Sequence, residues 1–268
     1  MKGTAAIALN VFRESVRDKV LYNLVFFAIL LIGASYLLGQ LTAGQDVKII
    51  KDLGLTATSI FGLFIAVFIG IGLVSKEVER RSIYGLLAKP IQRSQMVFGK
   101  YAGLVLTLVV NVAIMGAALY VVLGFMSLGV TSEVAKAWDA PALDPSLLKA
   151  LFLILLQLMI VTAIALFFST FSTPMLSAAF AFGLFVVGQF SADLRNFDQV
   201  VDSPAAVQLA RGLYWVLPNL AQFDVKSQVV HGQPVEAGYL LLTSIYALLY
   251  IGVLLVSSML IFSRRDFK

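Results

Sequence analysis

The sequence contains no cysteine, and it carries few charged residues for its length. The absence of cysteine excludes disulfides, thiolate metal sites and thiol nucleophiles. Only 13% of the 268 residues are charged while 60% are hydrophobic, whereas about a quarter of the residues in a soluble domain are charged. With a mean hydropathy of +0.92, the chain is predicted to form a single all-α membrane domain over residues 1–268.

Two further absences bear on function. The Walker A pattern GxxxxGK[ST] is missing, because the Gly99-Lys100 pair has Ser94 in place of the first glycine and Tyr101 in place of Ser or Thr. The single histidine, His231, stands beside a glycine in a predicted outer loop and is interpreted as a loop residue. We therefore expect no enzyme activity, metal site or bound cofactor in this chain. Any ATP-driven work would need a partner protein.

Six apolar runs reach about the twenty residues needed to cross a bilayer. The predicted spans are approximately Val20–Gly39, Leu53–Val74, Tyr101–Gly124, Leu147–Ser169, Met175–Ala192 and Tyr239–Phe262. Beyond their terminal turns they contain no Asp, Glu, Lys, Arg or His, which disfavours an ion-coupled transporter. The charged segment before the first span does not resemble a cleavable signal peptide, so this span is expected to be an uncleaved anchor.

The distribution of basic residues predicts the orientation of the chain. One side would hold the N-terminus, the loop after the second span, the "TFSTP" turn and the C-terminus. That side carries 13 of the 20 basic residues and 5 of the 15 acids. Both termini are therefore expected in the cytoplasm of a multi-pass cell (inner) membrane protein. This bias also accounts for the net charge of +5 without nucleic-acid binding.

Two amphipathic segments lie outside the predicted spans. Before the first span, Ala5, Leu9, Phe12 and Val16 recur on one face of a predicted helix, as expected for a helix in the cytoplasmic interface. The alternative is a solvated leader to the first span. Before the last span, a predicted helix from Ser203 to Pro218 has Ser as its N-cap and would rest on or dip into the outer leaflet.

The polar and small residues of the spans offer packing chemistry. A stripe along the second span lets another helix approach closely; it consists of Thr58, Gly62, Ala66 and Gly70. We expect this stripe and Gln189 of the fifth span to lie at an interface between two copies, although the stripe could instead pack within one subunit. Asn111 and Gln157 could line a path, although interhelical hydrogen bonds are the simpler interpretation.

The segment "SKEVERRSIYGLLAKPIQR", Ser75–Arg93, places seven charged residues between the second and third spans. With about 3.6 residues per turn, it forms a short helix that Pro90 ends. One face is charged and presented to water; it comprises Glu77, Arg80, Arg81 and Tyr84. Glu79 projects instead towards the apolar face and needs a donor there. An ordinary cytoplasmic loop is the alternative interpretation.

This segment resembles the cytoplasmic segment of ABC-2 type permeases, the membrane subunits of one class of ABC exporter. The family pattern is approximately E-x-E-x-[GR]-[ST]-[IL]-x-x-L-L-x-x-P, and it is matched by Glu77, Glu79, Arg81, Ser82, Ile83, Leu86, Leu87 and Pro90. The pieces "LPNLAQFD" (Leu217–Asp224) and "SRRDF" (Ser263–Phe267) agree with the family. Tyr84 departs from a position that is often acidic.

The resemblance implies a homodimer or heterodimer of permeases above two separate ATPase subunits, which bind ATP and Mg. The charged segment would be the coupling helix that contacts the ATPase, with Glu77, Glu79, Arg80, Arg81, Ser82 and Tyr84 as its site residues. The N-terminal helix would transmit motion, and the outer segment would be a re-entrant cap. An amphiphilic, lipid-linked or peptide cargo would fit. A secondary transporter, a channel, or a structural or assembly subunit of a membrane complex remain alternatives.

Overall fold

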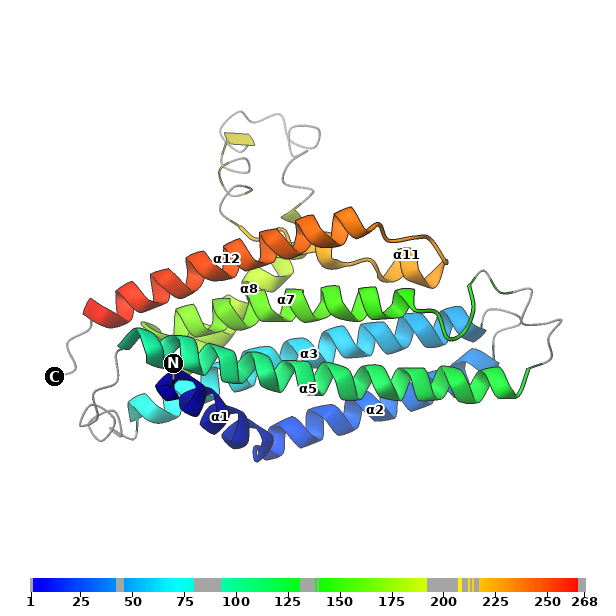
Figure 1. Ribbon diagram of the computed structural model, residues 1–268, viewed down its shortest axis with the longest axis horizontal. Coiled ribbons are helices and arrows are strands. Elements are labelled where there is room, and N and C mark those ends of the chain that lie inside the picture. Colours follow the sequence, from blue (N-terminus) through cyan, green and yellow to red (C-terminus); the bar gives the residue numbers. More distant parts are fainter. Residues whose placement is uncertain are drawn as a thin grey trace.

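The computed structural model describes residues 2–41, 46–79, 93–130, 138, 140–191, 207–208, 212, 214 and 217–264. These residues form helices and contain no β-strand (Figure 1). The elements are α1 (Lys2–Val16), α2 (Lys19–Gln40), α3 (Asp46–Glu79), α5 (Arg93–Leu128), α7 (Ser146–Ser169), α8 (Pro174–Gln189), the 3₁₀ turn η2 (Ala221–Phe223), α11 (Lys226–Val230) and α12 (Ala237–Arg264).

Five of the described helices are long and apolar enough to cross a membrane, namely α2, α3, α5, α7 and α12. The prediction of an all-α membrane protein is therefore confirmed in its coarse form. The fifth predicted span, Met175–Ala192, is the exception, because α8 has only 16 residues. At about 1.5 Å per residue it extends roughly 24 Å, which is less than the hydrocarbon thickness of about 30 Å.

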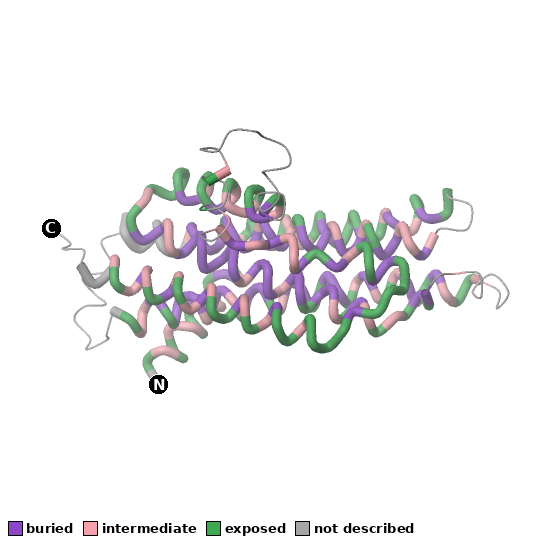
Figure 2. The backbone as a smooth tube through the Cα atoms, turned by 90° about the horizontal axis from the view of Figure 1, so that it is seen from above, coloured by how far each residue is buried: buried purple, intermediate pink, exposed green. Residues whose placement is uncertain are grey.

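α7 and α3 form the centre of the bundle. In each of them 72% of the membrane-crossing window is buried, compared with 22% in α2 and α12. α7 contacts α3, α5, α8 and α12, and buried positions follow the middle of the bundle (Figure 2). The uniform apolarity of α7 has a structural cause, since a helix surrounded by other helices needs apolar residues on all its sides.

α3 begins earlier than the sequence predicted. It starts at Asp46 instead of Leu53 and continues without interruption for 34 residues. Its first two turns therefore include Lys51, a side chain with no exposed surface. A prediction from hydropathy begins the span after this lysine, because a hydropathy scale assigns the same unfavourable value to every lysine, whether or not its ammonium group has a partner within the protein.

α1 packs against the first turns of α5 through two glycines of α5. A Cβ atom on Gly103 would lie 2.5 Å from the backbone oxygen of Ala8 and 2.7 Å from Cβ of Val11. Gly99 approaches Ile7 in the same way. The buried face of α1 therefore differs from the apolar face noted in the sequence, where Leu9 remains 44% exposed. α1 has two apolar faces, one against α5 and one directed outward.

The first and the last of the described helices meet at one end of the bundle. α1 and the end of α12 are found there together with the end of α3 and the beginning of α5 (Figure 1). α11 and the beginning of α7 lie at the opposite end. This arrangement groups the segments that the distribution of basic residues assigned to one side.

Substitution of Gly103 by alanine should displace α1 from α5, because the new methyl group would meet backbone atoms that cannot move without the helix. We expect oxidative crosslinking of a cysteine pair placed across the α1–α5 contact to fall severalfold. Gly33→Ala is the matched control, since a Cβ atom on Gly33 has nothing within 4 Å. Equal crosslinking in the two variants would contradict the packing.

Candidate functional site

The small-residue stripe of α3 faces α7 of the same chain. A Cβ atom on Gly62 would lie 2.4 Å from Cδ1 of Leu158, and one on Gly70 would lie 3.5 Å from Cβ of Ala165. Thr58 and Ala66 are buried, and the Thr58 hydroxyl donates to the Gly54 carbonyl at 2.8 Å. The stripe thus adopts the packing within one subunit that the sequence left as the alternative. Gln189 is partly buried at the end of α8.

Two polar residues in the middle of α5, Thr107 and Asn111, donate hydrogen bonds to carbonyls of their own helix. The Asn111 side chain is buried, and its Nδ2 donates to the Thr107 carbonyl at 2.7 Å. The Thr107 hydroxyl in turn donates to the Gly103 carbonyl at 3.0 Å. Asn111, a candidate path residue, therefore lies in the packed interior of the structure.

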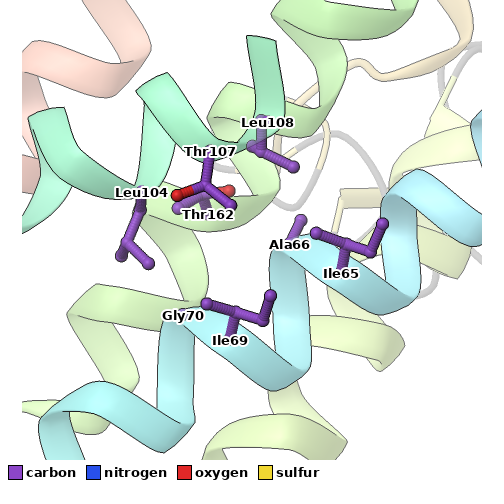
Figure 3. A pocket seen from close by; sticks show the side chains of 8 residues that line it. All are labelled: Ile65, Ala66, Ile69, Gly70, Leu104, Thr107, Leu108 and Thr162. Atoms are coloured by element: carbon purple, nitrogen blue, oxygen red, sulfur yellow. The ribbon is translucent and has the colours of Figure 1, made fainter. Parts of the chain in front are cut away.

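Residues of α3, α5 and α7 meet at a tightly packed, largely apolar junction. It is lined by eight residues, Ile65, Ala66, Ile69, Gly70, Leu104, Thr107, Leu108 and Thr162 (Figure 3), and it has no volume accessible to a water molecule. The Thr162 hydroxyl donates to the Leu158 carbonyl of its own helix at 2.8 Å. At this junction, the described helices leave no open passage.

The segment Leu217–Val225 is the main irregularity of the bundle. It consists of non-helical backbone and the short η2 turn, and it packs on the end of α8. The Leu220 backbone N–H donates to the Gly188 carbonyl at 2.9 Å. A Cβ atom on Gly188 would lie 2.9 Å from the Pro218 carbonyl oxygen, so a glycine at this position allows the close approach.

Gln157 of α7 places this segment beside the middle of that helix. Its Nε2 donates to the Leu220 carbonyl at 3.2 Å. Gln157 is 11 residues after Ser146 and 12 before Ser169, the two ends of α7. The Leu220 backbone therefore lies about halfway along the most buried helix. Non-helical backbone at this depth is tolerated only when it is buried in protein or lines a cavity.

Side chains from two other helices complete the hydrogen bonds of this segment. The Asn219 backbone N–H donates to the Tyr246 hydroxyl of α12 at 2.9 Å. The Ser191 hydroxyl, just after α8, donates to Asn219 Oδ1 at 2.9 Å. The Gln222 Nε2 is buried and has no hydrogen-bond partner among the described residues. We call Gln157, Ser191, Asn219 and Tyr246 the mid-membrane polar cluster.

Sequence reasoning identified only part of this cluster. Gln157 was singled out as a polar residue within an apolar span, and Asn219 falls within "LPNLAQFD" (Leu217–Asp224), which was noted only for its resemblance to the family. Ser191 and Tyr246 were not identified. The available signal was Pro218 followed by Asn219, which ends a helix with polar residues only about twenty positions before the last span. The predicted outer element, Ser203–Pro218, is described only at residues 207, 208, 212, 214, 217 and 218.

The charged segment continues from the far end of α3. Glu77 and Glu79 belong to the last turn of that helix. The remaining predicted coupling residues, Arg80, Arg81, Ser82 and Tyr84, lie outside the described residues.

A protein-family model described as "ABC-2 family transporter protein" matches residues 5–267. The chain belongs to the ABC-2 family. A search of curated proteins found no match. The family and the apolar helices together make the chain a multi-pass transmembrane permease of the ABC transporter type. The mid-membrane polar cluster is thus located in an ABC-2 permease, between α7, α8 and α12.

Replacing Gln157 by methionine should destabilise this ABC-2 permease, because the Leu220 carbonyl would lose its side-chain donor inside the bundle. The expected loss is about 1–3 kcal/mol, measured as a lower midpoint of thermal unfolding in detergent. Thr162→Val is the control, since the Thr162 hydroxyl bonds only to a carbonyl of its own helix in the structure. A midpoint for Gln157→Met no lower than that of the control would contradict the role of the Gln157 bond.

Proposed function

We propose that this chain is the permease subunit of an ATP-driven exporter whose ATPase is a separate protein. The observation that carries the proposal is the family match over residues 5–267. The missing Walker A pattern supports a separate ATPase, because the chain lacks the phosphate-binding loop and lysine of that motif. ATP and Mg would bind to that partner.

Two helices are suited to carry movement from the ATPase into the membrane. α3 joins the charged segment directly, and its 34 residues extend about 50 Å at 1.5 Å per residue. α1 is attached to the first turns of α5, which follow the charged segment, through Gly99 and Gly103. Displacement of the coupling segment would therefore move α3 directly and α1 together with α5. Under this proposal, both helix ends lie in the cytoplasm.

The cargo best suited to this interior is an amphiphilic, lipid-linked or peptide molecule. The junction between α3, α5 and α7 is closed and apolar apart from two threonines. The hydroxyls of these threonines are bonded to their own helices. A small hydrated ion would find few groups there to replace its water, whereas an apolar chain would lose little on entering. The polar end of such a cargo could bond to the mid-membrane polar cluster.

A second copy of the permease would complete the transporter on the side of α8. The stripe on α3 is covered by α7, so it is not free to contact a second copy. Within the second and fifth predicted spans, the surfaces that remain for such a contact are the exposed face of α3 and that of α8. Phe68 of α3 is 48% exposed and its ring lies 5.9 Å from that of Phe182. Val186, four residues after Phe182 and 53% exposed, extends this apolar face along α8. The second and fifth predicted spans therefore remain the proposed interface, but through a different face of α3.

Charge reversal in the coupling segment tests the proposed function. The double variant Arg80→Glu with Arg81→Glu should insert normally but lose copurification with the ATPase, or lose cargo-stimulated ATP hydrolysis, because the charged face would repel its partner. Lys226→Glu, at the opposite end of the bundle, should leave both properties unchanged. Normal copurification and ATP turnover in the double variant would refute the assignment.

Single cysteines can test the proposed orientation without background, since the chain has none of its own. A cysteine at Ser82 should react with a membrane-impermeant maleimide only after the cells are opened. A cysteine at the exposed His231, beyond the other end of the bundle, should react in intact cells. The reverse pattern would show that the orientation is wrong.

A further inference from the structure

Lys51 occupies an unusual position for a lysine. Its side chain has no exposed surface, and it is the bulkiest of the fully buried side chains in the described part of the chain. The ammonium Nζ donates to the Pro141 backbone carbonyl at 2.8 Å. Asp144, three residues further along the same loop, adds an electrostatic attraction. Lys51 therefore joins the beginning of α3 to the loop before α7.

Packing alone does not explain a lysine at this position. Burial of an ammonium group is unfavourable unless hydrogen bonds and an opposite charge compensate for the lost water. A methionine would fill much of the same space without this penalty. The particular contribution of lysine is the long reach of its ammonium group to a backbone carbonyl 90 residues away in sequence.

The loop that Lys51 holds has a second face. Ala140 and Ala142 are buried on either side of Pro141, and the Tyr120 hydroxyl donates to the Asp144 carbonyl at 2.9 Å. The other face of the loop forms one wall of a pocket of about 450 Å³, whose opposite wall contains Gly232, Gln233 and Pro234. Movement of the loop would change the shape of this pocket.

A second lysine holds the opposite wall. Lys149 lines the pocket, and its Nζ donates to the Val235 backbone carbonyl at 2.8 Å. Lys149 belongs to α7, the central helix, whereas Lys51 belongs to α3. Both walls are thus tied to α7, the first through the chain itself at Ser146 and the second through Lys149, and Lys51 adds a link from the first wall to α3. A shift of α3 relative to α7 would therefore act on the first wall through Lys51.

α3 connects Lys51 to the charged segment at the other end of the bundle. From Lys51 to Glu77 there are 26 residues of unbroken helix (77 − 51), or about 39 Å. A hydrogen bond of 2.8 Å is lost once the distance between its atoms grows to about 3.6 Å. Once the lysine side chain is fully extended, a further displacement of roughly 0.8 Å along the bond therefore separates Lys51 from the Pro141 carbonyl.

We propose that Lys51 is a positioning residue that latches the 140–146 loop to α3 and releases it when the coupling segment moves that helix. This inference rests on the proposed function, because the movement would come from the ATPase. In the latched state the loop closes the outer end of the bundle against α3. Release opens the wall of the 450 Å³ pocket on the side where the cargo leaves.

A buried reporter on the loop tests the latch in the permease alone. Ala142, 4% exposed, is changed to cysteine in the cysteine-free chain and labelled with a membrane-impermeant maleimide. Lys51→Met should raise the labelling rate about tenfold, as expected for loss of one charge-assisted hydrogen bond. Lys19→Met, at the exposed beginning of α2, also removes a lysine charge and should leave the rate unchanged. A cysteine at Leu143, already 49% exposed, controls for access of the reagent.

Variants of Lys51 separate a latch from a general loss of structure. Lys51→Arg retains a donor of similar reach and should restore slow labelling of Ala142→Cys. If Lys51→Met accumulates poorly, Lys51→Gln replaces it, because its shorter side chain cannot reach the Pro141 carbonyl. Slow labelling in both Lys51→Met and Lys51→Gln, or fast labelling in Lys51→Arg, would overturn the proposal.

The complex with the ATPase tests the release. ATP should accelerate labelling of Ala142→Cys when Lys51 is present and add nothing in the Lys51→Met variant. An equal response to ATP in both chains would overturn the latch. Failure of any ATPase to copurify with the unmodified chain would count against the proposed function, whereas the labelling rates of the permease alone would still decide for or against the latch.

Discussion

Inside a bilayer, every backbone N–H and C=O group must find its partner within the protein, since no water is present to replace it. Regular helices meet this condition by themselves in their interior turns, as α2, α3, α5, α7 and α12 do. The segment Leu217–Val225 does not. Gln157, Gly188 and Tyr246 supply hydrogen bonds to it from three directions. The positions of α7, α8 and α12 are coupled through this one segment.

The close contacts between helices occur at glycines, which have no side chain to keep the neighbouring helix away. Gly62 lets Leu158 of α7 approach α3, and Gly54 accepts Leu119 of α5 in the same way. Gly103 admits the backbone of α1. Without a hydrophobic driving force between helices in lipid, such contacts must provide much of the packing energy. The contact of α1 with α5 and that of the central pair α3–α7 therefore both depend on glycines at the point of closest approach.

Hydropathy was sufficient to predict the helices that face lipid or apolar protein on all sides. The fourth predicted span, Leu147–Ser169, agrees with α7 within one residue at its start. α3 was predicted too short because Lys51 is sheltered by a carbonyl distant in sequence. The partner of the small-residue stripe could not be predicted, because glycines permit an approach without specifying which helix approaches. The mid-membrane polar cluster joins residues from 157 to 246, and no local pattern contains that information.

The shortness of α8 has a consequence for the surrounding lipid. Its exposed residues, among them Met175 and Phe180, present an apolar band about 6 Å shorter than the hydrocarbon layer. Lipid next to this helix must thin to match it, at a cost of a fraction of a kcal/mol per ångström. Covering α8 with protein removes that hydrophobic mismatch. Membrane thickness itself would thus favour association at this face, more strongly in thick bilayers than in thin ones.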